Sequence, residues 1–171
     1  MFDFCLALMI MCGPAPQAAK AAPVNPQIDY AGFKALTESV DEYRRRRLVS
    51  WDAFAAAARQ KDVLILDARS ASAFAAGHIE GAVNLPFTDF TDESLAQVIG
   101  RADRPILIYC NNNFSNDVAP VAVKSVRLAL NIQTFINLVG YGYENVRELN
   151  DVVDFNDPKV KWVRGKAMAR R

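Results

Sequence analysis

Two short runs of consecutive apolar residues constrain the fold of this chain more than any other feature. Residues 63–66 read Val-Leu-Ile-Leu and end at Asp67, and residues 106–109 read Ile-Leu-Ile-Tyr and end at Cys110. A strand that is apolar at every position is typical of a strand buried on both of its faces. Such strands lie inside parallel sheets that helices cover on both sides. The sequence therefore predicts a sheet of this kind that contains both runs.

Strands and helices alternate around these two runs. Apolar spacing and capping residues predict helices over residues 30–43, 50–58, 71–76, 91–100 and 131–139, the last with Asn131 as its N-cap. Further strands are expected at residues 82–85 and, as the last strand, at residues 145–149. Residues 120–130 fit either a strand, because Val126, Leu128 and Leu130 alternate, or a helix. We assign the chain to the α/β class, with helices on both faces of a parallel sheet.

Residues 1–22 are predicted to be a signal peptide. The apolar run at residues 4–11 is too short to span a bilayer, which needs about 20 residues, and Ala19-Lys20-Ala21 offers a small-x-small cleavage pattern. Asp3 departs from the positive start of such peptides, so a displaced start or a short anchor stays open. We expect export to the periplasm without stable membrane insertion after cleavage. If the segment is not a signal, the protein is expected to be cytoplasmic.

The rest of the chain is expected to divide into three parts. These are a linker and helical extension at residues 23–47, the main domain at residues 48–163, and a basic tail at residues 164–171. A chain of 171 residues with 51% hydrophobic composition can bury a sizeable core as one domain. The four arginines at residues 44–47 fit either the solvated end of a helix or a basic docking patch.

Charge and composition exclude several classes of function. A formal net charge of +1 gives no overall basic field, so nucleic acid is not an expected partner. No group of Cys and His residues has the spacing of metal ligands, and no glycine-rich phosphate loop follows a strand. Neither a metal nor another cofactor is therefore predicted, and the sequence assigns no oligomeric state.

Cys110 is the candidate nucleophile, because sites in parallel α/β sheets form where strands end and loops begin. Cleavage of the signal peptide would remove the other two cysteines, Cys5 and Cys12. Backbone N–H groups of a loop curled around the sulfur would favour the thiolate and lower its pKa. An inert buried cysteine is the alternative. The loop predicted to bind the substrate consists of Asn111, Asn112, Asn113, Phe114, Ser115 and Asn116.

Four segments resemble, in the same order, those of the rhodanese family. Residues 66–69 are similar to its Asp-x-Arg strand end, and residues 74–86 to its first signature, with Glu80 in place of a proline. Cys110 and its loop match the active-site cysteine, and residues 142–149 resemble the closing segment. The resemblance covers about residues 48–150. It implies a rhodanese-like parallel sheet with helices on both faces.

The resemblance also implies a sulfurtransferase. The Cys110 thiolate would take a sulfur atom from a donor such as thiosulfate, hold it as a persulfide, and pass it to a thiol or cyanide. The implied partners are thus a small sulfur-containing donor and a thiol acceptor. Asp67 and Arg69 are expected to pair and shape the floor of the site. His78 is expected to be a structural residue near a turn and not a base.

Two departures from the family pattern leave a second interpretation open. Residues 111–123 carry no positive charge that could hold an anionic donor, and Lys124 is the nearest downstream cation. An insertion near residues 118–130 is expected to cover the site. The second interpretation is a non-catalytic rhodanese-like module that binds a partner or senses sulfide. Phosphatase or arsenate reductase chemistry is disfavoured, because the loop lacks an arginine for the equatorial oxygens.

Overall fold

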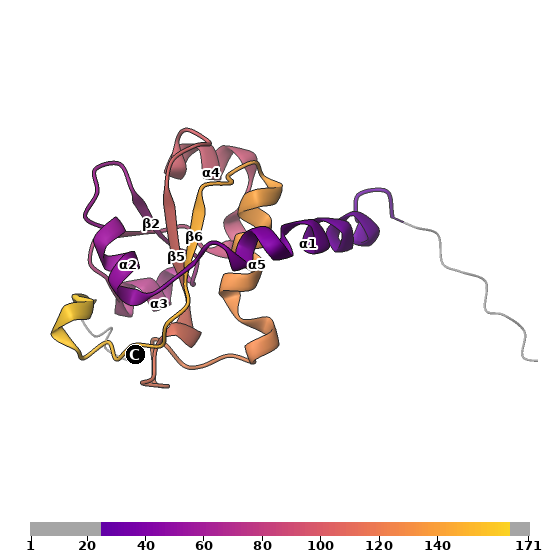
Figure 1. The fold of residues 1–171 in the computed structure, drawn as a ribbon. Coiled ribbons are helices and arrows are strands. Elements are labelled where there is room, and N and C mark those ends of the chain that lie inside the picture. Colours follow the sequence, from indigo (N-terminus) through magenta and orange to yellow (C-terminus); the bar gives the residue numbers. More distant parts are fainter. Residues whose placement is uncertain (1–24, 165–171) are drawn as a thin grey trace, which may run out of the picture. The chain divides into compact units, whose positions relative to one another are not determined.

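The computed structural model describes residues 25–164, in which strands and helices alternate over most of the chain (Figure 1). The helices are α1 (Tyr30–Arg45), α2 (Trp51–Ala57), α3 (Ala71–Ala76), α4 (Asp92–Ile99) and α5 (Leu130–Gly140). The strands are β1 (Leu48–Val49), β2 (Leu64–Asp67), β3 (Gly77–Ile79), β4 (Ala82–Asn84), β5 (Ile106–Tyr109), β6 (Val146–Leu149) and β7 (Trp162–Arg164). The predicted signal peptide and the tail beyond residue 164 lie outside the described residues.

Five strands form one sheet in the order β1-β6-β5-β2-β4, and every neighbouring pair is parallel. The two apolar runs of the sequence are β2 and β5, which lie side by side with Asp67 opposite Tyr109. All four residues of each of these strands are buried. The predicted parallel sheet is confirmed, and β5 is its middle strand.

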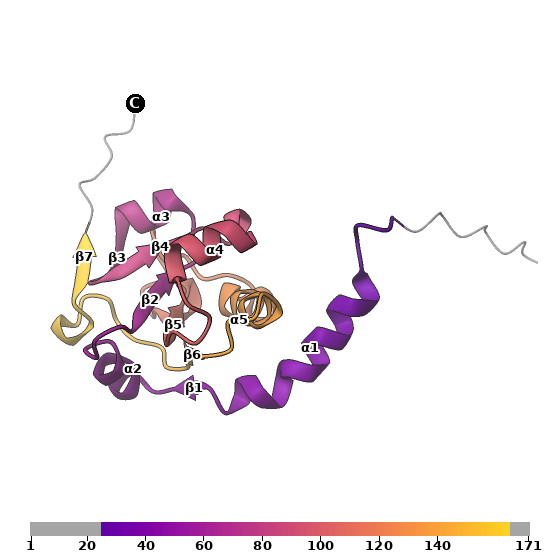
Figure 2. The same ribbon diagram turned by 90° about the horizontal axis from the view of Figure 1, so that it is seen from above.

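Helices cover both faces of the sheet, as Figure 2 shows from above. On one face α2 packs through Trp51 and Phe54 on a core that includes Ile65 and Leu107. The core of the other face joins α4 and α5 to the sheet. Its main members are Leu64, Leu66, Leu95, Ile99, Ile106, Ile108, Phe135 and Leu138. Successive residues of β2 and β5 thus enter opposite cores, which is why both strands are apolar at every position.

Side-chain caps begin α2 and α4 where the sequence predicted these helices. The Ser50 side chain accepts a hydrogen bond from the Ala53 N–H, and the Thr91 side chain accepts one from the Ser94 N–H. Such oxygens satisfy N–H groups that have no partner inside the first turn. Gly100 ends α4 with φ at 83°, a conformation that favours glycine.

The end of α1 is tied to the sheet by one arginine of the four-arginine run. Arg44 donates two hydrogen bonds, of 2.6 and 2.7 Å, to the carboxylate of Glu148 in β6. Arg45 and Arg46 instead form ion pairs with acidic residues of α1 itself and are exposed. The run is therefore partly a solvated helix end and partly an anchor.

The sequence missed three very short strands. β1 extends the parallel sheet, and β3 pairs with β7 in a separate two-stranded antiparallel sheet, with His78 opposite Val163. The strand expected at residues 145–149 is therefore not the last one. Arg164 belongs to β7 and not to the tail that was predicted from residue 164. Strands of two or three residues are too short to show a period in the sequence.

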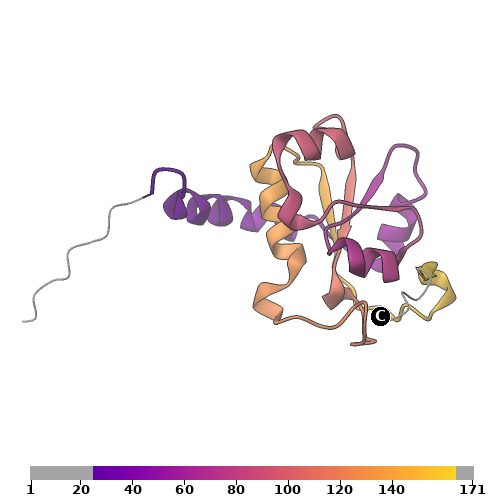
Figure 3. The same ribbon diagram turned by 180° about the vertical axis from the view of Figure 1, so that it is seen from behind.

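Residues 120–130 form neither of the two predicted structures. They contain only the short 3₁₀ turn Val126–Leu128 before α5 begins, and Figure 3 shows a long loop between β5 and α5. Val126 and Leu128 alternate in the sequence, but both side chains are exposed, so the alternation does not reflect a buried face. Asn131 is also not the N-cap, because Ala129 precedes the helix and Asn131 lies buried in its first turn.

No helix within residues 25–164 combines the length and the apolar character that crossing a bilayer requires.

Candidate active site

Cys110 directly follows β5, at the carboxyl end of the middle strand of the sheet. The residue is 2% exposed and is a free cysteine. Residues Asn111–Asn113 after it form one 3₁₀ turn. The thiol thus lies where the sites of open parallel sheets form.

Backbone N–H groups from two segments act on the Cys110 thiol. They belong to Asn131 and Leu130 at the start of α5 and to Asn112 in the turn. Burial raises the pKa of the thiol, whereas these N–H groups lower it, and the net direction is upward. The predicted lowering of the pKa is therefore wrong for the free thiol. The loop was predicted to direct backbone N–H groups at the sulfur, and in the structure Asn112 does so. The N–H groups of Leu130 and Asn131 at the start of α5 were not predicted.

The Asn113 side chain holds the end of β5 in place. Its Oδ1 accepts hydrogen bonds of 2.9 Å from the Cys110 N–H and from the Asn131 side chain. Its Nδ2 donates to the carbonyl oxygens of Leu149 and Asp151, at 2.8 and 3.0 Å. Four partners saturate this buried amide. Asn113 was predicted to bind substrate, but in the structure its side chain joins the backbone of Cys110 to the backbone of Leu149 and Asp151.

Asn131 is a site residue that the sequence did not identify. Its backbone N–H acts on the Cys110 thiol, and its Nδ2 donates to Asn113. Its Oδ1 is buried without a hydrogen-bond partner in the described part of the chain. Unpaired buried acceptors are uncommon in native proteins and call for an explanation. The sequence signal was an asparagine at a helix start, which equally fits a cap.

Asn111 and Asn112 hold the long loop after the turn. Asn111 Nδ2 donates to the carbonyl of Ala122 at 2.8 Å. Asn112 makes two hydrogen bonds with the backbone of Lys124: its Nδ2 donates to the carbonyl at 2.9 Å and its Oδ1 accepts the N–H at 3.1 Å. We call residues 118–129 the cover segment, because these bonds fix it beside the turn that follows Cys110.

A cavity of about 440 Å³ opens at Cys110. The turn contributes Cys110, Asn111 and Asn112 to its wall, and the cover segment contributes residues that include Pro120 and Lys124. Residues of the range 118–130 thus form part of the cavity wall, and the predicted insertion that covers the site stays a prediction. Its size falls within the range of about 300–1,000 Å³ that is usual for small-molecule sites. No carboxylate lines this cavity within the described residues.

Asp67 and Arg69 form a buried ion pair next to this cavity. Their side chains meet at 2.6 Å, and the Tyr109 hydroxyl donates to Asp67 Oδ2 at 2.5 Å. Arg69 also donates to the carbonyl of Gly77 at 2.8 Å and lines the cavity, whereas Asp67, which was predicted to shape the floor with it, does not line the wall. Since Asp67 pairs with Arg69, Lys124 is the remaining positively charged side chain among the described residues of the cavity wall.

His78 lies outside the wall of this cavity. Its Nδ1 is 2.8 Å from the carbonyl oxygen of Phe74, and its ring stacks on the Phe74 ring with centroids 3.8 Å apart. These contacts fit the structural role that the sequence suggested. A base at Cys110 has to be sought elsewhere.

The second half of the predicted substrate loop points away from the cavity. Phe114 is 1% exposed and packs in the core that contains Tyr109. Ser115 and Asn116 form hydrogen bonds with Val153 and Asp154, in the chain after β6. Of the six loop residues, the structure therefore brings Asn111 and Asn112 to the cavity wall.

Within residues 25–164 no group of three or more His, Cys, Asp or Glu side chains is placed to hold a metal ion. The fold and the site together define an α/β protein in which the one cysteine of residues 25–164 is buried at the carboxyl end of the middle strand. The model of the rhodanese-like domain family matches residues 50–151. The chain therefore belongs to the rhodanese-like domain family.

A curated relative is the thiosulfate sulfurtransferase GlpE of Shewanella oneidensis, which is 41% identical over 61 residues. The match covers 34% of this chain and 55% of the relative, so the chain spans about half the length of that protein. Among solved structures, a rhodanese-like domain from Anabaena studied by NMR has a TM-score of 0.50 at 20% identity, over 73% of this chain and 83% of that chain. A crystal structure of such a domain from the same source covers 64% and 99%, with 20% identity and a TM-score of 0.46.

Proposed function

We propose that this protein is a sulfurtransferase that carries sulfur as a persulfide on Cys110. The observation that carries the proposal is the position of the thiol. It lies at the wall of a cavity, next to N–H groups of Asn112, Leu130 and Asn131 that can stabilise an anion on the sulfur. The relationship to a thiosulfate sulfurtransferase supports the same chemistry.

The reaction with thiosulfate consists of two displacements. The Cys110 thiol first loses its proton to solvent, and the thiolate attacks the outer sulfur of the donor. The sulfur–sulfur bond of thiosulfate breaks, sulfite leaves with the electron pair, and a persulfide anion remains on Cys110. An acceptor thiolate then attacks the outer sulfur and restores the Cys110 thiolate, which is the pattern of covalent catalysis with ping-pong kinetics.

The N–H groups at Cys110 matter most after the first displacement. Burial disfavours the charge of a free thiolate, but the persulfide places its negative charge on the outer sulfur, one bond farther from the strand end. Preorganised N–H donors stabilise such a charge without the cost of reorienting water. Lys124 at the cavity wall would attract the dianionic donor.

The test is mass spectrometry of the Cys110 peptide after the protein is incubated with thiosulfate. We expect a gain of one sulfur atom that cyanide or dithiothreitol removes. Cys110→Ser should abolish both the gain and the turnover of thiosulfate. An unmodified peptide, or activity that survives Cys110→Ser, would refute the proposal. The intact mass of protein isolated from the periplasm also tests the proposed export, because cleavage near residue 22 removes a defined N-terminal mass.

A second candidate function is a non-catalytic module that binds a partner. The observations in its favour are the 2% exposure of Cys110 and its raised pKa, which lowers the fraction of the thiol that is present as the reactive thiolate. The same experiment separates the two functions. Binding of a partner that persists in Cys110→Ser, without any persulfide in the native protein, would favour the module.

A further inference from the structure

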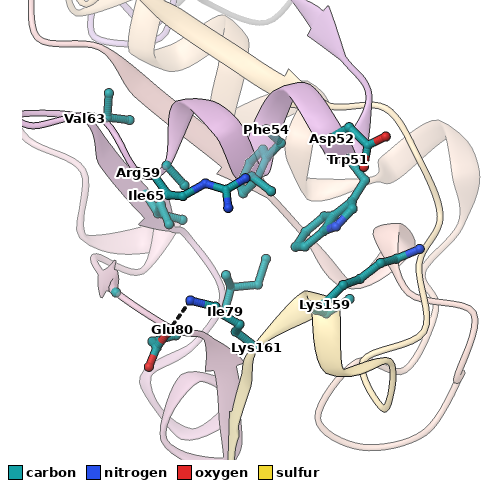
Figure 4. A pocket seen from close by; sticks show the side chains of 14 residues that line it. Trp51, Asp52, Phe54, Arg59, Val63, Ile65, Ile79, Glu80, Lys159 and Lys161 are labelled. Atoms are coloured by element: carbon teal, nitrogen blue, oxygen red, sulfur yellow. Dashed lines mark ion pairs between the residues drawn. The ribbon is translucent and has the colours of Figure 1, made fainter.

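A second cavity, of about 410 Å³, lies on the α2 side of the sheet. Its wall consists of residues from α2, the start of β2, the turn after β3 and the chain before β7, and it shares no residue with the cavity at Cys110. Figure 4 shows α2 on one side and the segment with Ile79 and Lys161 on the other. The proposed sulfur transfer makes no use of this cavity.

The floor of this second cavity is apolar and belongs to the core. Trp51, Phe54, Ile65, Ile79 and Val160 form it, and each of them is at most 6% exposed. The indole of Trp51 faces the hollow from α2 in Figure 4. A wall of this kind, with a few polar groups at fixed places, is typical of small-molecule sites.

Among the described residues that line this cavity, Arg59 is the cation without an ion-pair partner. Lys161 pairs with Glu80 at 3.6 Å, and Lys159 pairs with Asp157 at 3.2 Å. The structure gives the Arg59 side chain no ion pair or hydrogen bond with a described residue, and its guanidinium extends into the hollow in Figure 4. A planar guanidinium matches carboxylate groups with two parallel hydrogen bonds.

The acidic side chains of the wall do not cancel this charge. Glu80 is already paired with Lys161. Asp52 lies in the first turn of α2, whereas Arg59 lies in the turn that follows the end of this helix at Ala57. Figure 4 accordingly shows Asp52 at the end of the cavity where Lys159 lies, and Arg59 at the other end. The Arg59 end therefore favours a negative group, and the floor favours an apolar one.

We infer that the second cavity is a binding site for an amphipathic anion, such as a medium-chain carboxylate. The carboxylate would lie at Arg59 and the hydrocarbon on the floor formed by Trp51, Phe54 and Ile79. This site is independent of the proposed sulfur transfer, because it uses neither Cys110 nor the cover segment.

The test measures the binding of octanoate to the full chain by calorimetry and by the indole signals in ¹H–¹⁵N spectra. The chain has two tryptophans, and Trp162→Phe identifies the Trp51 signal. We expect saturable binding that shifts the Trp51 indole, with octanol and octylamine at least tenfold weaker. Arg59→Gln should weaken octanoate binding about tenfold, or about 1.4 kcal/mol. Since Arg59 is exposed, this substitution leaves the core intact.

Arg46→Gln on α1 is the matched control, because it removes the same charge outside both cavities and should leave binding unchanged. Three outcomes would overturn the inference: no saturable binding, octanol or octylamine binding as tightly as octanoate, or an equal loss in Arg46→Gln. Cys110→Ser should bind octanoate like the native chain, so failure of sulfur transfer and failure of this site are told apart.

Discussion

The side chain of Asn112 makes two hydrogen bonds with the backbone of Lys124, twelve residues further along the chain. Asn112 also contributes an N–H group to the Cys110 thiol. One residue therefore links the sulfur to the segment that brings a lysine to the cavity. A loop that lacks positive charge in the sequence acquires one from a segment folded back on it.

Lys124 is expected to select an anionic sulfur donor. In Lys124→Gln the KM for thiosulfate should rise about tenfold while kcat changes little, because loss of one charge-assisted contact is worth roughly one power of ten. Steady-state transfer to cyanide gives both constants. Arg127→Gln, an exposed cation that does not line the cavity, serves as the control and should behave like the native protein. An unchanged KM in Lys124→Gln would remove the lysine from donor recognition.

The raised pKa of Cys110 predicts a specific pH profile. Only the thiolate reacts with iodoacetamide, so alkylation of the native protein should rise about tenfold per pH unit and show no plateau near 8.5, the usual cysteine pKa. The urea-denatured chain should level off near that pH. The rate is read from the Cys110 peptide, apart from those of Cys5 and Cys12. A native plateau at or below pH 8.5 would contradict the effect of burial.

Asn113→Ala should destabilise the fold by about 2–4 kcal/mol. The substitution leaves the Cys110 N–H and two carbonyl groups without their partner, and each unpaired buried group costs about 1–3 kcal/mol before relaxation. Urea denaturation followed by circular dichroism measures the change. Asn150→Ala, at an exposed position whose side chain forms no such bond with another described residue, should stay within about 0.5 kcal/mol. Equal effects of the two substitutions would show that the hydrogen bonds of the Asn113 side chain do not stabilise the fold.

The Asp67–Arg69 pair should show strong coupling. Arg69→Met leaves the buried Asp67 carboxylate without its cation, and we expect a loss of about 3–5 kcal/mol in unfolding free energy. The double substitution with Asp67→Asn should lose clearly less than the sum of the two single losses. Urea titrations of the four proteins complete the cycle. Additive losses would mean that the interaction between Asp67 and Arg69 makes no direct contribution to the free energy of unfolding.

The sequence predicted those parts of the fold that depend on local signals. The apolar runs of β2 and β5 and the caps Ser50 and Thr91 can each be recognised within a few residues. β3 and β7 cannot, because a three-residue strand owes its existence to a partner about eighty residues away. The alternation of Val126 and Leu128 led to a strand being predicted, but both side chains are exposed, so this alternation does not mark a buried face.

The candidate site divides along the same line. Cys110 could be predicted as a site residue because it lies at the end of an apolar run. The pairing of Asp67 with Arg69 could also be predicted, because the two residues are close in the chain. Asn131 and Lys124 could not be assigned, because only the fold brings α5 and the cover segment to Cys110. Phe114 to Asn116 were placed at the site by sequence proximity alone, although the chain turns away after Asn113.

The Tyr109 hydroxyl lies between the two cavities without lining either. It accepts the N–H of Ile79, a wall residue of the second cavity, at 3.2 Å and donates to Asp67, the partner of Arg69. One buried hydroxyl group therefore joins the backbone of β3 to the Asp67–Arg69 ion pair. The end of the middle strand is thereby a common structural support, directly for Ile79 at the second cavity and through Asp67 for Arg69 at the first, although the two cavities share no residue.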